Sequence, residues 1–123
     1  MHIYLIGISH DFQIPPQDNF EEYVFEACIK YKVKSIDEEM CKDALDDFNI
    51  SQSTVKSVAK KCCLPHIYCG PGKRERKARG ISGEFLLKVQ RMHHEWTDDR
   101  FREEMQKDRK KRETIWLECL KTI

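Results

Sequence analysis

The chain has 123 residues, of which 40% are hydrophobic and 35% are charged, and its formal net charge is +1. This length suits a single ordinary domain, and the composition is typical of a soluble globular protein rather than a disordered one. No apolar run is long enough to span a membrane, and the N-terminus lacks the basic and apolar regions of a signal peptide. We therefore expect a cytoplasmic protein with no membrane segment.

Three short apolar runs predict the strands of a small parallel sheet. They cover residues 2–8, 33–37 and 64–69. Between the first two, apolar residues at helical spacing predict an amphipathic helix over 20–31, with Asn19 as its cap. Shorter helices are expected between the second and third strands. This alternation predicts two right-handed βαβ units and the strand order 2-1-3.

The C-terminal third is predicted to be helical. A polar loop runs from Gly70 to Gly80, after which Ser82 can cap one helix and Thr97 can begin another. We therefore expect one α/β domain over 1–123, with a βαβαβ core over 1–80 and C-terminal helices over 81–123. Because a three-stranded sheet is small for such a fold, either the C-terminal helices or a second subunit must close the core, and we expect a homodimer.

Each predicted strand ends in residues suited to a site. His10 follows the first, Asp37, Glu38 and Glu39 follow the second, and Cys69 ends the third. The carboxyl ends of parallel strands share one edge, where open α/β sheets bind ligands. There His10, Glu38 and Glu39 could be catalytic as a general-base group, or His10 and Glu38 could hold a divalent metal as cofactor. The commoner interpretation is a structural histidine beside a solvated acidic turn.

The six cysteines include no CxxC pair, so we predict reduced thiols. Cys69 would be a nucleophile if Arg74 or Arg76 activates its thiolate, and otherwise a buried strand-end residue.

Charge is distributed unevenly along the chain. Residues 1–50 carry 4 basic and 11 acidic side chains, whereas residues 51–80 carry 8 basic and 1 acidic. The basic run over 73–79 predicts either solvated helix faces or an anion site. The segment from Gln106 to Glu113 has no apolar residue and is expected to face solvent or the acidic half of another molecule.

Several short motifs together resemble a group of small bacterial α/β proteins of unassigned function, which carry GxxH, EE, FCDP…ER…GI and REExWL. Here these are Gly7-x-x-His10, Glu38-Glu39, His66-Ile-Tyr-Cys69-Gly-Pro71, Glu75-Arg76 before Gly80-Ile81, and Arg112-Glu113-x-x-Trp116-Leu117. The layout is more distantly similar to the TraB, ChaN and erythromycin-esterase-like hydrolases, which place a histidine after the first strand and a glutamate after the second. The resemblance adds Arg112 and Glu113 to the expected substrate-binding residues.

The chain departs from that pattern in two ways. Gly70 stands where the group has aspartate, and the chain ends before a further strand with a second GxxH. A partner would then have to supply the missing part of the site.

The leading prediction is a hydrolase-like protein that acts on an anionic small molecule or nucleotide, with Arg74, Arg76 and Cys69 binding the substrate. An alternative is a non-catalytic binding module that uses residues 73–79 to bind nucleic acid or an acidic protein. A third is a truncated interaction protein that has lost the chemistry.

Overall fold

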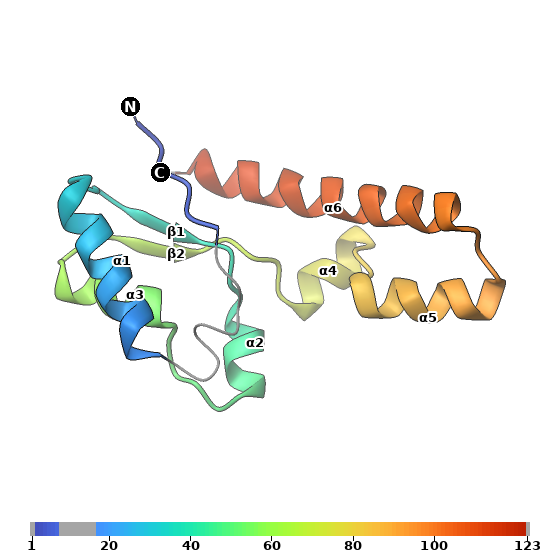
Figure 1. The fold of residues 1–123 in the computed structure, drawn as a ribbon, viewed down its shortest axis with the longest axis horizontal. Helices are drawn as coiled ribbons and strands as arrows, with labels where there is room; N and C mark the ends of the chain where they lie inside the picture. The colour runs from blue at the N-terminus through green and yellow to red at the C-terminus, as the bar shows by residue number, and fades with distance from the viewer. Residues whose placement is uncertain (1, 8–16, 123) are drawn as a thin grey trace. The chain divides into compact units, whose positions relative to one another are not determined.

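A computed structural model describes residues 2–7 and 17–122. Most of these residues are helical, and the one described sheet has two strands. In chain order the elements are α1 (Asp18–Lys30), β1 (Ile36–Glu38), α2 (Lys42–Asp47), α3 (Thr54–Lys61), β2 (His66–Tyr68), α4 (Lys73–Arg79), α5 (Glu84–His94) and α6 (Asp98–Leu120) (Figure 1).

The predicted three-stranded sheet of order 2-1-3 is wrong. β1 and β2 pair in parallel, with the Ile36 N–H donating to Pro65 O at 2.9 Å and the Cys69 N–H donating to Glu38 O at 2.7 Å. Residues 2–7 belong to no strand, and Leu5 is 85% exposed. An apolar run predicts burial but does not provide a neighbour for backbone pairing, and this segment instead places the Tyr4 ring against Tyr31 at 4.5 Å between centroids.

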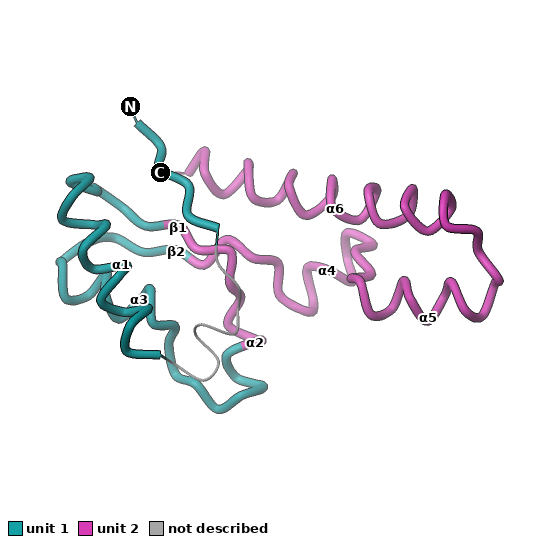
Figure 2. Tube along the Cα trace, viewed as in Figure 1, with its two compact units in different colours: residues 1–36, 45–67 teal, residues 37–44, 68–123 magenta. Residues whose placement is uncertain are grey.

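The chain divides into two compact units, and the chain passes from one to the other within each strand (Figure 2). Unit 1 comprises residues 1–36 and 45–67, and unit 2 comprises residues 37–44 and 68–123. The single-domain organisation over 1–123 stays a prediction.

Unit 1 has its core between α1 and α3. Phe20, Val24 and Cys28 recur every fourth residue along α1 and pack with Val55 and Val58 of α3. This apolar stripe was predicted for α1, and such a stripe stabilises a helix by burying one face. α3 begins where the Ser53 side chain accepts a hydrogen bond from the Lys56 N–H at 3.1 Å, as expected of a serine cap.

Unit 2 contains α4 and a hairpin of α5 and α6, which run antiparallel (Figure 1). Asp108 of α6 is only 7% exposed, and its carboxylate accepts from the Ser82 N–H at 2.7 Å and the Gly83 N–H at 3.1 Å. These are backbone donors at the start of α5, which a helix leaves without partners of its own. α6 itself begins at Thr97, whose hydroxyl accepts from the Arg100 N–H at 3.2 Å.

Among the described helices, none has both the length and the apolar character needed to cross a membrane.

Candidate functional site

The predicted catalytic and metal-binding group is described only in part. His10 lies outside the described residues. Glu38 is 6% exposed, whereas Glu39 is exposed and forms an ion pair with Arg112 at 3.6 Å. Within residues 2–7 and 17–122, no three His, Cys, Asp or Glu side chains are grouped as a metal ion would require. A role for His10 with Glu38 stays a prediction.

The ion pair between Glu39 and Arg112 does bring together two predicted site residues that are far apart in the sequence. Both belong to unit 2, and Glu113 beside them is exposed. An exposed pair at this distance contributes little to stability, because water screens the attraction and two long side chains lose freedom. The pair nevertheless places Arg112 of α6 near the end of β1.

Cys69 forms a disulfide with Cys119, with 5.8 Å between the two Cα atoms. The prediction that all six cysteines are free thiols is therefore wrong for these two, and Cys69 in this state offers no thiolate to a substrate. The other four remain free: Cys28, Cys41, Cys62 and Cys63. Burial raises the pKa of the Cys28 thiol above its usual range, and nearby Cys62 raises it further, so Cys28 is a poor nucleophile.

The basic run expected in a loop instead forms α4. The helix follows two glycines packed closely against residues 40–43: a Cβ at Gly70 would lie 2.9 Å from the Met40 backbone, and one at Gly72 would lie 2.7 Å from Asp43 Oδ2. The Lys73 N–H donates to Asp43 Oδ2 at 2.6 Å. Because a carboxylate already occupies this helix start, anions are expected at the side chains of α4 rather than at its N-terminus.

Two faces of α4 differ in their partners. Arg79 pairs with Glu75 at 3.5 Å and with Glu118 of α6 at 2.9 Å. The hydrogen bond raises the pKa of Arg79 and lowers that of Glu118. Lys73, Arg74 and Lys77 are exposed, and their i, i+1 and i+4 positions share another side of the helix. We call these three residues the α4 basic face.

A second group of cations lies on α6 over residues 107–112, here called the α6 basic segment. It carries five basic side chains and one acid, and that acid is the buried Asp108. The Lys111 ammonium donates to Gly80 O at the end of α4 at 3.0 Å, where the helix dipole favours a cation. The sequence shows the five basic residues over 107–112 and predicts that they face solvent or another molecule. The contact of Lys111 with the end of α4 was not predicted.

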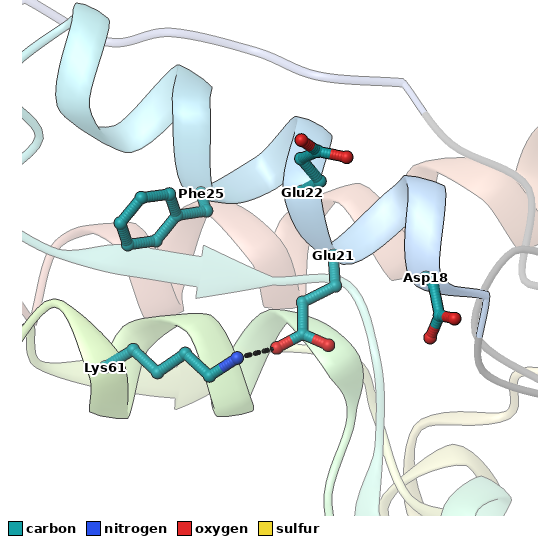
Figure 3. A pocket seen from close by; sticks show the side chains of 5 residues that line it. All are labelled: Asp18, Glu21, Glu22, Phe25 and Lys61. Atoms are coloured by element: carbon teal, nitrogen blue, oxygen red, sulfur yellow. Dashed lines mark hydrogen bonds and ion pairs between the residues drawn. The ribbon is translucent and has the colours of Figure 1, made fainter.

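A hollow in unit 1 was not anticipated from the sequence. It has a volume of about 420 Å³ and is lined by Asp18, Glu21, Glu22, Phe25 and Lys61 (Figure 3). Lys61 pairs with Glu21 across it, so one of its three carboxylates is already neutralised. The other two acids, Asp18 and Glu22, are exposed and remain hydrated. A ligand would therefore gain little binding free energy by contacting them.

No protein-family model, curated protein or solved structure is significantly similar to this chain, so the resemblance to the small bacterial group stays a prediction.

Proposed function

We propose that this protein is a polyanion-binding module that contacts the phosphate backbone of nucleic acid through the α4 basic face. The main support is that, among the described residues, Arg74 and Lys77 have no ion pair to break before a phosphate can bind. Both are exposed, and the same helix carries five basic side chains against one acid. A hydrolase-like activity at His10 and Glu38 remains the other prediction.

The surrounding charge favours this function. The α6 basic segment lies beside the C-terminal end of α4 through Lys111 and Gly80. Its only acid, Asp108, is turned inward to the start of α5. Lys107 and Arg112 pair with Glu104 at 3.3 Å and Glu39 at 3.6 Å, so the added charge comes mainly from Arg109, Lys110 and Lys111. Neighbouring cations add to one positive potential even when they lie on different faces, and such a potential attracts a polyanion from a distance.

The type of contact follows from the side chains present. Residues 70–80 contain no aromatic side chain on which a base could stack. Lysine and arginine contacts to phosphate position a protein on nucleic acid without reading its sequence. We therefore expect binding that depends strongly on salt and weakly on base sequence. A cytoplasmic location, which we also propose, would give access to such ligands.

Fluorescence anisotropy with a labelled DNA duplex of mixed sequence tests this function. The double variant Arg74→Ala/Lys77→Ala should weaken binding and reduce the slope of log affinity against log salt by about 2, because each lost phosphate contact removes about 0.9. The matched control is Lys34→Ala/Lys60→Ala, which removes two exposed cations from unit 1 and should leave the slope unchanged.

Two results would contradict the proposal. The first is an absence of duplex binding by the unmodified protein even at low salt. The second is an equal loss of affinity in both double variants, which would show that net charge alone matters. Tight binding of polyglutamate in place of the duplex would favour an acidic protein partner instead.

A further inference from the structure

The Cys69–Cys119 disulfide closes a ring that contains both groups of cations. The ring spans 50 positions in the sequence and lies wholly in unit 2. The α4 basic face begins four residues after Cys69, and the α6 basic segment ends seven residues before Cys119. The state of one bond therefore limits how far these two groups can separate.

The contacts that hold the last turns of α6 without the disulfide are weaker. Glu118 pairs with Arg79, and Arg112 pairs with Glu39, but the side chains of both pairs are between 40% and 52% exposed. Exposed ion pairs contribute little, and salt weakens them further. The stronger anchors are Asp108 and buried Ile115, which lie closer to the middle of the helix.

We propose that reversible reduction of the Cys69–Cys119 disulfide regulates polyanion binding by unit 2, with the oxidised form binding more tightly. This inference rests on the proposed function. The disulfide holds α6 beside α4 before the ligand arrives, so less conformational freedom is lost on binding. Reduction removes the covalent tie at the end of α6, and the α6 basic segment is then held beside α4 by the non-covalent contacts of Asp108 and Lys111 and by the burial of Ile115.

The chemistry is thiol–disulfide exchange with a dithiol reductant. Cys119 is the more exposed partner, since Cys69 is only 4% exposed, so the reductant thiolate attacks the Cys119 sulfur. A mixed disulfide forms on Cys119, and Cys69 leaves as a thiolate that takes up a proton. The second thiol of the reductant then releases Cys119 as a thiol. The reductant ends as its own disulfide, and two electrons and two protons have passed to the protein.

Of the four free thiols, Cys41 belongs to unit 2 with this pair, and Cys28, Cys62 and Cys63 belong to unit 1. Burial disfavours the thiolate of Cys28. Cys63 is exposed and lies outside the ring, which makes Cys63→Ser a control for loss of a surface thiol.

The test measures duplex affinity by anisotropy for the full chain, oxidised and after treatment with dithiothreitol, with thiol counting to verify each state. Reduction should weaken binding by roughly threefold to tenfold, through lost preorganisation. Cys119→Ser should bind like the reduced protein and ignore the reductant. Cys63→Ser should respond as the unsubstituted protein does.

Hydrogen exchange adds a readout that does not depend on the ligand. Amides over 112–120 should exchange faster after reduction. Faster exchange with unchanged affinity would overturn the regulatory role, as would six free thiols in the protein before reduction. Equal affinity in both redox states would refute this inference alone. A protein that binds no duplex in either state would refute the proposed function as well, so the two failures are distinguishable.

Discussion

Replacing Asp108 by alanine should be among the most destabilising changes in unit 2. Its carboxylate accepts hydrogen bonds from the N–H groups of Ser82 and Gly83, at 2.7 and 3.1 Å, and the residue is 7% exposed. A hydrogen bond to a charged group contributes about 1.5–3 kcal/mol, and removing the acceptor leaves two partly buried donors without this partner. Since the two bonds share one carboxylate and are not additive, we expect Asp108→Ala to cost about 2–4 kcal/mol.

The conservative variant sharpens the prediction. Asp108→Asn keeps one acceptor oxygen at nearly the same position, so its cost should be about half that of Asp108→Ala. Urea unfolding followed by far-ultraviolet ellipticity measures both values. Glu113→Ala is the matched control on the same helix, because Glu113 is exposed, and its effect should stay within about 0.5 kcal/mol. If Asp108→Ala were as mild as Glu113→Ala, this carboxylate would not cap α5.

Three further predictions concern packing, pH and association. Val58 is fully buried and Val89 is 46% exposed, so Val58→Ala should lower the free energy of unfolding by about 2 kcal/mol and Val89→Ala by much less, as urea titration would measure. The hydrogen bond from Arg79 lowers the pKa of Glu118, so this pair stabilises the fold above the ordinary glutamate pKa and loses that effect as pH falls through the lowered value. Carboxyl NMR titration should find that Arg79→Ala returns Glu118 toward its ordinary pKa. If the protein is a homodimer, as expected, light scattering at micromolar concentration should give a molecular mass of twice 14.7 kDa. A mass of 14.7 kDa at all concentrations would exclude the dimer.

Local patterns in the sequence were sufficient for some elements. The stripe of Phe20, Val24 and Cys28 identified α1, because helical spacing is a property of nearby residues. Thr97 was identified as a cap residue for the same reason, since a cap depends on two or three neighbours. The predicted caps Asn19 and Ser82 are wrong, because Asn19 lies inside α1 and Gly83 is the cap residue of α5. The exposed Tyr23 shows the limit of this reasoning, since a stripe indicates which side is apolar but not how much of it is covered.

Elements that depend on distant partners were harder to predict. The segments around β1 and β2 were recognised as extended, but only three residues of each pair in the sheet. The glycines and proline of segment 70–80 predict a loop, yet residues 73–79 are mostly lysine and arginine, which favour helix. The prediction of a loop gives more weight to the helix-breaking residues at the two ends of this segment than to the helix propensity of residues 73–79. Glycines, however, commonly flank a helix.

The concentration of basic side chains over 73–79 was visible in the sequence, but the sequence left open whether they form an anion site or solvated helix faces. An anion site there stays a prediction. The disulfide could not be foreseen, since the pairing of Cys69 with Cys119 requires α6 to return along the chain over 23 residues. A helix of that length spans about 35 Å, so its far end is placed by tertiary contacts and not by sequence neighbours.

The geometry of α6 explains which cations remain available to a ligand. Four of its residues recur at intervals of three or four along one face, where they are buried or contact the rest of unit 2: Asp108, Lys111, Ile115 and Cys119. Helical periodicity then places Arg109 and Lys110 on the side away from these contacts. Both are exposed. One face of α6 therefore caps α5, contacts the end of α4 and forms the disulfide, while its other face adds charge. This division explains how one helix can be structural along one face and still present the cations Arg109 and Lys110 on the other.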